Sequence, residues 1–393
     1  MSKNFFMLLL VWVNKWWGWA QVRNALRGRS TGKQGKVKSI LYTKKYYFRL
    51  ANGPCTLIFI LTFSFRSITK HMKKRKERKG LYCTLQTAVL LLALSPVYAH
   101  HLNIVTADSV SIEGRWDITM LMAGKERPSW LEVELSGLHT LVGRYVGTGG
   151  SARPISKINY SGGKMHFAIP PQWDKGDNDM VFDAELRGDS LVGTMIAVDG
   201  KSYDWVGRRA PSLRRNKPVV WGKPIVLFNG KDTRGWHTEG ANQWIAEAGI
   251  LRSPHSGSNL ITDKKFTDFK LHIEFRYPAE SNSGVYLRGR YEVQIEDDKG
   301  LEPTSHHLGG VYGFLTPSDM MAKAAGEWQS YDITLVGRMV TVIANGKTII
   351  SNQAIPGITG GALDSKEGEP GPLYIQGDHG PVDFRNIVIT PAK

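Results

Sequence analysis

The chain has very little cysteine, and the little it has lies near its beginning. Only two of its 393 residues are cysteine, Cys55 and Cys83, and none follows residue 83. Residues 100–393 therefore cannot contain a disulfide or a thiol nucleophile, and their stability must come from hydrophobic burial. These 294 residues are long enough for two hydrophobic cores.

Acidic residues are almost missing from the first 99 positions, which hold 19 lysines and arginines but a single acid, Glu77. The whole chain has a formal net charge of +16, which would favour nucleic acid or an anionic membrane as a partner. Residues 100–393 hold 32 basic and 34 acidic side chains, a net charge of −2. The positive charge thus belongs to the first 99 residues, and we expect no nucleic-acid partner.

Residues 72–99 have the three parts of a secretory signal peptide. A basic segment at 73–79 precedes an apolar run at 84–94, and a small-x-small cleavage site ends at Ala99. The apolar run is too short for a stable membrane span. We therefore expect an exported protein, periplasmic or extracellular, whose mature chain begins at His100. An uncleaved membrane anchor is the alternative.

We expect residues 1–71 to be a spurious extension, because a signal peptide normally begins a chain and this one begins at Met72. Two apolar runs in the extension, 5–13 and 55–65, are shorter than the roughly 20 residues that a membrane span needs. The alternative is that residues 7–19 or 57–65 are membrane segments. For the mature chain we expect no stable membrane span.

Helical periodicity is nearly absent after residue 100. Short alternating runs recur about every ten residues, separated by Gly, Asn, Asp and Pro, and this pattern predicts an all-β fold of sandwiches and barrels. Residues 210–224 are rich in proline and basic side chains and predict a linker. We expect a small β-domain at 100–209 before it and a second domain at 225–393 after it.

The first domain contains eight predicted strands, at 115–121, 130–135, 141–146, 155–160, 165–169, 181–186, 191–198 and 202–207. So many short strands predict an antiparallel meander that closes, or nearly closes, into a barrel. Trp116 on the first strand and Arg208 after the last resemble the lipocalin barrel, in which an arginine packs over a tryptophan. A structural β-domain is the favoured interpretation, and a ligand-binding barrel is the alternative.

The second domain contains ten predicted strands, at 244–248, 249–252, 269–277, 284–288, 291–296, 329–336, 339–344, 347–352, 373–376 and 382–390. Antiparallel strands without helices predict two packed sheets. Side chains alternate between the two faces of a strand, so each strand has one apolar face. The opposite faces carry His272, Glu274, Arg276, Tyr286, Arg288, Glu292, Gln294, Glu296, Tyr374 and Gln376. Such residues suit a sugar-binding face, with a solvated outer sheet as the alternative.

Several motifs follow one another in the second domain. They are LFNGKD at 227–232, GW at 235–236, NSGVYLRG at 282–289, YEVQI at 291–295, VYG at 311–313, GEW at 326–328, ANG at 344–346, YIQG at 374–377 and VDFRNI at 382–387. Together they resemble the 3-keto-disaccharide hydrolase family over about residues 225–391. The resemblance implies a concanavalin-like jelly-roll sandwich.

The resemblance also implies a reaction on a glycoside already oxidised at C3. A base removes the C2 proton, the C1 leaving group departs, and water then adds to the unsaturated sugar. The two-carboxylate strand motif of jelly-roll glycosidases is absent, so double displacement is not favoured. The catalytic candidates are Glu274 or His379 as the base, with Arg288 and Arg276 stabilising the enolate oxygen. The substrate-binding candidates are Glu292, Gln294, Tyr312, Gln376 and Tyr286.

Cofactor and function each keep an alternative open. No cofactor is certain, and a divalent metal stays open, although the loop pair His306-His307 is interpreted as exposed polar residues rather than metal ligands. The alternative to a carbohydrate-processing enzyme is a non-catalytic carbohydrate-binding module, which the same fold supports. A third hypothesis, a scaffold protein, requires a large exposed apolar patch that the sequence does not display.

Overall fold

The structure is a computed structural model, and it describes residues 42–48, 59–65, 111–172 and 175–393. The first two segments pair as an antiparallel sheet of β1 (Tyr42–Phe48) and β2 (Phe59–Phe65). The predicted signal peptide at 72–99 and the mature start at His100 lie outside the described residues. Both stay predictions, as does the interpretation of residues 1–71 as spurious.

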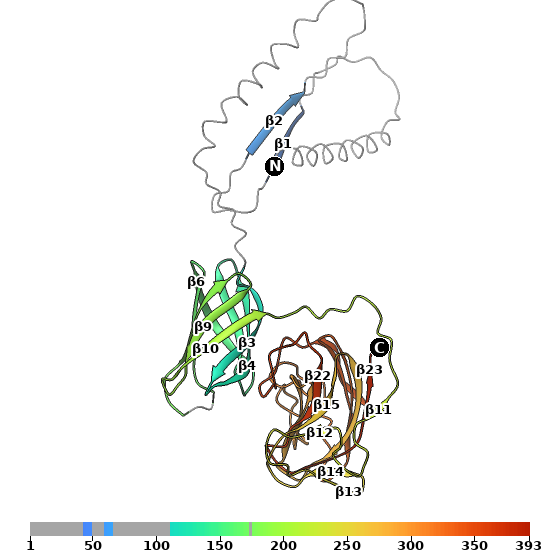
Figure 1. The fold of residues 1–393 in the computed structure, drawn as a ribbon. Helices are drawn as coiled ribbons and strands as arrows, with labels where there is room; N and C mark the ends of the chain where they lie inside the picture. The colour runs from blue at the N-terminus through green and yellow to red at the C-terminus, as the bar shows by residue number, and fades with distance from the viewer. Residues whose placement is uncertain (1–41, 49–58, 66–110, 173–174) are drawn as a thin grey trace, which may run out of the picture. The chain divides into compact units, whose positions relative to one another are not determined.

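The described residues form strands, turns and loops without an α-helix, which confirms the predicted all-β fold. It follows that no described helix could cross a membrane. All described residues from 111 onward lie within one compact unit, Val105–Lys393. This unit contains a closed barrel followed by a two-sheet sandwich (Figure 1).

Eight antiparallel strands close the barrel in the order β10-β3-β4-β5-β6-β7-β8-β9. They are β3 (Gly114–Met122), β4 (Lys125–Ser136), β5 (Thr140–Val146), β6 (Arg153–Ser161), β7 (Lys164–Ile169), β8 (Met180–Arg187), β9 (Ser190–Ile196) and β10 (Ser202–Arg209). Each predicted strand of this region is present. Buried side chains fill the interior, with Phe167 stacked on Phe182 at 4.5 Å between ring centroids in the same core as Trp116. Such filling favours the structural interpretation of the barrel over the ligand-binding one.

An arginine covers the buried tryptophan of the first barrel strand, but it is not the predicted one. The guanidinium of Arg209 lies 3.8 Å from the centroid of the Trp116 ring and donates hydrogen bonds to the carbonyls of Glu113 and Ser111. Arg208 is exposed instead. The prediction was wrong by one residue because β10 continues to Arg209, and alternation places neighbouring side chains on opposite faces.

The sandwich consists of two antiparallel sheets. The eight-stranded sheet has the order β13-β14-β23-β16-β19-β20-β21 with β11 paired to β23, and the five-stranded sheet has the order β12-β15-β22-β17-β18. The strands are β11 (Ile225–Val226), β12 (Trp236–His237), β13 (Ile245–Glu247), β14 (Ile250–Ser253), β15 (Leu260–Phe266), β16 (Phe269–Arg276), β17 (Asn282–Leu287), β18 (Tyr291–Glu296), β19 (Gln329–Val336), β20 (Met339–Ala344), β21 (Lys347–Ala354), β22 (Gly371–Ile375) and β23 (Val382–Pro391). This arrangement confirms the predicted sandwich.

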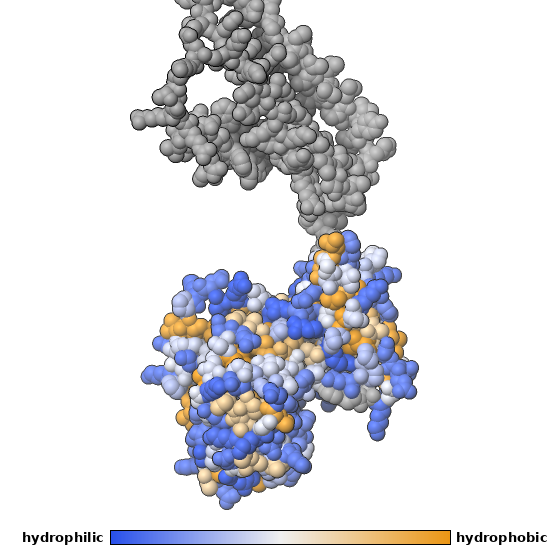
Figure 2. Space-filling view, turned by 180° about the vertical axis from the view of Figure 1, so that it is seen from behind, coloured by the Kyte–Doolittle hydropathy of each residue, from blue (hydrophilic) through white to orange (hydrophobic). Residues whose placement is uncertain are grey.

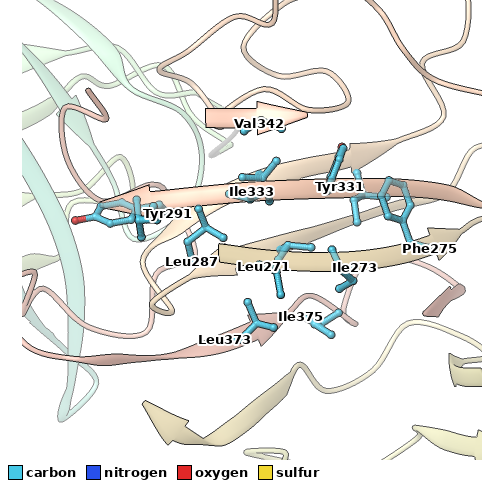
Figure 3. Close-up of a cluster of buried hydrophobic side chains, with 14 of the residues drawn as sticks. Leu271, Ile273, Phe275, Leu287, Tyr291, Tyr331, Ile333, Val342, Leu373 and Ile375 are labelled. Atoms are coloured by element: carbon cyan, nitrogen blue, oxygen red, sulfur yellow. The ribbon is translucent and has the colours of Figure 1, made fainter. Parts of the chain in front are cut away.

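The apolar faces of both sheets meet in one core. Figure 3 shows Leu271, Ile273 and Phe275 of β16 directed toward the side chains of neighbouring strands, among them Leu373 and Ile375 of β22. These residues are at most 2% exposed. The opposite faces of the sheets are therefore the places where polar side chains can gather.

The described surface mixes polar and apolar residues. Figure 2 shows hydrophilic residues over much of it in that view, with hydrophobic residues in smaller patches between them. The large hydrophobic side chains that stay exposed come from separate parts of the chain, including Leu138, Val220, Val226 and Leu301.

Candidate functional site

A row of side chains crosses the five-stranded sheet on the face directed away from the core. Ile261 of β15 pairs with Tyr374 of β22, Tyr374 pairs with Tyr286 of β17, and Tyr286 pairs with Glu292 of β18. Residues directly opposite each other in antiparallel strands point to the same face of a sheet. The two tyrosine rings stack with 4.2 Å between centroids. The row thus brings a buried, stacked pair of tyrosines next to a carboxyl group.

A second row beside the first holds two glutamines. Gln294 of β18 pairs with Gly284 of β17, and the backbone N–H of Gln376 donates to the backbone carbonyl of Gly284 at 2.9 Å. The side-chain oxygens Oε1 of Gln294 and Gln376 are buried and have no hydrogen-bond partner. Buried polar atoms are nearly always satisfied, so these two acceptors fit a site whose remaining partners are ligand hydroxyls.

Gly284 makes room for the carboxyl group of Glu292. A Cβ atom at Gly284 would overlap the Glu292 Oε1 atom. Because Gly284 has no side chain, the Glu292 carboxyl can lie over β17, between the two rows. This close approach explains why a glycine stands in the interior of a strand, where it otherwise weakens the sheet.

Glu292 has an electrostatic environment that suits an acid. Its side chain is only 4% exposed, and burial raises its pKa to about 8, while the neighbouring Tyr286 hydroxyl and His379 act in the opposite direction. A carboxyl group in such surroundings is mostly protonated at pH 7 and can donate a proton.

His379 lies at the mouth of the site with Asp378. Its Nδ1 is 2.7 Å from Asp378 Oδ1, and both side chains are about half exposed. The hydrogen bond to Asp378 raises the pKa of His379 above its usual 6.5, and Glu292 adds to the shift. A histidine oriented by a carboxylate at Nδ1 leaves Nε2 for proton transfer.

Tyr312 closes another side of the site. Its backbone N–H donates to the Glu292 carbonyl at 3.1 Å, and its ring meets that of His306 edge to face at 5.1 Å. Burial raises the pKa of the Tyr312 hydroxyl, so this hydroxyl stays protonated and can donate a hydrogen bond.

A cavity of about 210 Å³ lies at the β15 end of the first row. Ile261 and Leu363 form its apolar lining, and Asp378, Asn259 and Glu239 are among its polar lining residues. The side-chain Nδ2 of Asn259 also donates to the Tyr374 hydroxyl at 2.7 Å. The cavity therefore lies next to the stacked tyrosines, and its mixture of apolar and hydroxyl-binding groups suits a sugar unit.

Two of the catalytic candidates lie on the other sheet. Glu274 and Arg276 of β16 occupy the outer face of the eight-stranded sheet, where Glu274 accepts hydrogen bonds from Arg385 Nε at 2.6 Å and Asn386 Nδ2 at 2.8 Å. Arg276 Nε donates to Asp383 at 2.9 Å. Burial alone would raise the pKa of Glu274, but these hydrogen bonds lower it. The structure thus does not bring the two residues to Glu292.

Arg288 is also separate from the site. The sequence predicts a strand through Arg288, but β17 ends at Leu287, and Arg288 adopts a φ of 54° in the turn. Its side chain is 1% exposed and donates to the Tyr291 hydroxyl at 2.8 Å and the Gly337 carbonyl at 3.1 Å. The early end of the strand breaks the alternation on which its predicted position depended.

The structure thus gathers six of the nine predicted site residues on one sheet face: Tyr286, Glu292, Gln294, Tyr312, Gln376 and His379. It adds Asn259, Gly284 and Asp378. Asn259 precedes a strand that the sequence pattern did not reveal, and Asp378 is the sequence neighbour of the predicted His379. Within the described residues, no group of three or more His, Cys, Asp or Glu side chains is arranged to hold a metal ion.

Residues 223–390 match the family model of the 3-keto-alpha-glucoside-1,2-lyase-like domain. This part of the chain belongs to that family. The match confirms the resemblance carried by the motifs, and it supports a glycoside-processing enzyme. The family domain contains both sheets of the sandwich and every residue of the candidate site.

Solved structures also resemble the chain. A candidate glycosyl hydrolase from Parabacteroides distasonis is 30% identical and has a TM-score of 0.38, over 45% of this chain and 92% of that one. A second from the same organism is 20% identical with a TM-score of 0.37, over 43% and 94%. A carbohydrate-binding module from Bacillus subtilis is 12% identical with a TM-score of 0.28, over 40% and 95%. No curated protein matches the chain.

Proposed function

We propose that the protein cleaves 3-keto-glycosides by removing the C2 proton, eliminating the C1 substituent and adding water. The observation that carries the proposal is the buried Glu292, whose pKa burial raises, beside the His379–Asp378 pair, within a domain of the 3-keto-alpha-glucoside-1,2-lyase-like family. An acid and a base with different surroundings are what an elimination of this kind requires.

Each chemical step has a group in the site. His379 Nε2 takes the C2 proton, and the electrons of the C2–H bond form the C2–C3 double bond of an enolate whose negative charge lies on the C3 oxygen. When the enolate collapses, the C3–O double bond re-forms, the C1–C2 double bond forms and the C1–O bond breaks. Glu292 gives its proton to the departing oxygen. The enolate oxygen at C3 accepts hydrogen bonds from the hydroxyl of Tyr312 and from the side-chain Nε2 of Gln376. For hydration, Glu292 takes a proton from water as the oxygen adds to C1, and His379 returns its proton to C2.

The site also supplies the groups that hold the sugar. The stacked rings of Tyr286 and Tyr374 are buried and support the site from within the sheet face, and the buried Oε1 atoms of Gln294 and Gln376 accept hydrogen bonds from the hydroxyls of the sugar. This assignment moves acid catalysis to Glu292, which the sequence motifs assigned to substrate binding.

The test is to incubate the purified protein with a 3-keto-glucoside and with the corresponding unoxidised disaccharide, with and without a chelator. We expect sugar release from the keto form alone. Equal release from the unoxidised disaccharide would show an ordinary glycosidase. Saturable binding of unoxidised sugar without any product from either form would show a carbohydrate-binding module. The chelator arm reports whether a divalent metal takes part.

We also propose that the protein is exported and cleaved near Ala99, as its sequence pattern predicts. Mass spectrometry of the native protein should then find an N-terminal peptide that begins at His100. A peptide from residues 1–71 would contradict both the cleavage and the interpretation of that segment as spurious.

A further inference from the structure

Two short segments hold the strands that carry the site. The first is 359–361, in which the Thr359 hydroxyl accepts a hydrogen bond from the Glu292 amide at 3.0 Å and the Gly360 carbonyl accepts one from the Tyr286 hydroxyl at 3.0 Å. The second is 312–313, in which the Tyr312 amide donates to the Glu292 carbonyl at 3.1 Å. The position of Glu292 therefore depends on where both segments lie.

Both segments pack against one loop of the barrel, residues 147–152 between β5 and β6. The Gly361 amide donates to the Thr148 carbonyl at 3.1 Å. A Cβ atom at Gly360 would overlap the Gly150 carbonyl oxygen, and one at Gly313 would lie 2.8 Å from Ser151 Cβ. Backbone approaches this close leave no room for a side chain, so the loop fits the two segments without a gap.

A tryptophan of the barrel anchors this contact. Trp130 of β4 is fully buried, and it packs in the core cluster of the sandwich rather than in that of the barrel. Its ring meets Phe314 edge to face at 5.3 Å, and a Cβ atom at Gly357 would overlap its indole nitrogen. Truncating Trp130 would therefore weaken the contact between barrel and sandwich while leaving the barrel's own core intact.

We infer that the barrel is a positioning part of the candidate active site, because its 147–152 loop fixes the segments that hold Glu292 and Tyr286. The barrel contributes no group to the chemistry. It keeps the 359–361 and 312–313 segments closed over the site and so keeps water away from the Glu292 carboxyl. In its catalytic consequence this inference rests on the proposed function.

The test uses two variants of the full chain, Trp130→Ala from the barrel side and Gly360→Ala from the sandwich side. Val206→Ala, at a partly exposed position on barrel strand β10, is the control. We expect kcat for a 3-keto-glucoside to fall about ten- to a hundred-fold in the two variants and to stay unchanged in the control. In a plot of kcat against pH, the loss of activity at alkaline pH should move to lower pH in the two variants. Water that reaches the Glu292 carboxyl lowers its pKa, so the group loses its proton at a lower pH.

A second measurement does not depend on turnover. Hydrogen exchange at the Glu292 and Gly361 amides, both of which are hydrogen-bonded in these segments, should become faster in Trp130→Ala and stay unchanged in Val206→Ala. If the native protein fails to cleave 3-keto-glycosides, the proposed function is wrong, and exchange still decides the positioning role. Unchanged exchange, or an equal loss of activity at every pH without a shifted limb, would overturn the inference.

Discussion

At the scale of single residues, the chemistry of the site depends on the surroundings of Glu292 rather than on its residue type. Burial raises its pKa to about 8, whereas hydrogen bonds lower the pKa of Glu274 on the other sheet despite its own partial burial. Two glutamates of one domain are therefore in different protonation states at neutral pH. Only the one held neutral can donate a proton to a leaving oxygen.

Replacing this acid should abolish most of the activity. For Glu292→Gln we expect kcat to fall roughly 10²- to 10⁴-fold, the usual contribution of a positioned acid, while the isosteric amide preserves the fold. Steady-state kinetics with a 3-keto-glucoside measures the loss. The matched control is Glu274→Gln, which should keep kcat within about twofold because Glu274 does not face the site. The reverse result would return the catalytic role to Glu274.

The activity should depend on pH with two limbs. The base, His379, must be deprotonated, so activity rises as the pH passes its pKa, which lies above 6.5. The acid, Glu292, must be protonated, so activity falls as the pH passes about 8. Asp378→Asn replaces the carboxylate that raises the His379 pKa with a neutral amide, so the rise of activity at the acidic side of the profile should move to lower pH. A kcat profile that is flat from pH 6 to 9 would exclude this pair.

At the scale of strands, alternation predicts which side chains share a face but not which sheet that face belongs to. The apolar faces of β16, β17, β18 and β22 all followed from the sequence, and all are buried. Their polar faces look alike in the sequence, yet β16 lies in one sheet and the other three lie in the second. Strand order depends on pairing between distant segments, so Glu274 and Glu292 could not be separated by pattern alone.

Two strands of the site sheet, β12 and β15, were not predicted, and β15 was missed for a local reason. β15 (Leu260–Phe266) reads Leu-Ile-Thr-Asp-Lys-Lys-Phe, with no regular alternation. Its pairing with β22 shifts register between Ile261 and Lys265, so an irregularity interrupts the period of two on which the prediction depends. With β15 undetected, Ile261 and Asn259 could not be placed beside Tyr374. The missed strand therefore hid the cavity end of the site.

The middle strand of the site, β17, offers a test of its own. A methyl group at Gly284 would overlap the Glu292 carboxyl, so Gly284→Ala should displace the acid and lower kcat about ten- to a hundred-fold. Gly207→Ala in barrel strand β10 is the matched control, because a Cβ atom there meets its neighbours at 3.4 Å or more. Circular dichroism should show both variants folded. Unchanged kcat in Gly284→Ala would mean that the carboxyl position does not matter.

At the scale of the whole molecule, barrel and sandwich meet through buried charge as well as through Trp130. Asp117 of β3 lies against Glu367 of the sandwich, and both are buried. Burial opposes ionisation of Glu367, but Arg338 holds its pKa below the usual value. Burial and the Glu367 charge together raise the pKa of Asp117 to about 9. Asp117 is therefore the neutral partner at pH 7.

The stability of the molecule should consequently decrease as the pH rises. Because the folded-state pKa of Asp117 lies above its unfolded value of 3.8, its contribution is complete below pH 3.8 and is lost as the pH rises through about 9. Asp117→Asn stays uncharged and keeps a hydrogen bond to Glu367. We expect Tm of this variant at pH 9 to exceed that of the native protein by about 3 °C or more.

The slope of Tm against pH distinguishes this cause from others. Glu292, with its raised pKa of about 8, adds a decrease of the same sign, so Asp117→Asn should reduce the slope between pH 5 and 9 without removing it. Adding Glu292→Gln should remove most of the remainder, since the two groups lie in separate networks and their effects should add. Thermal melts at several pH values measure both slopes. If Tm of Asp117→Asn falls with pH as steeply as Tm of the native protein, the Asp117 carboxyl does not carry a proton in the folded protein at neutral pH.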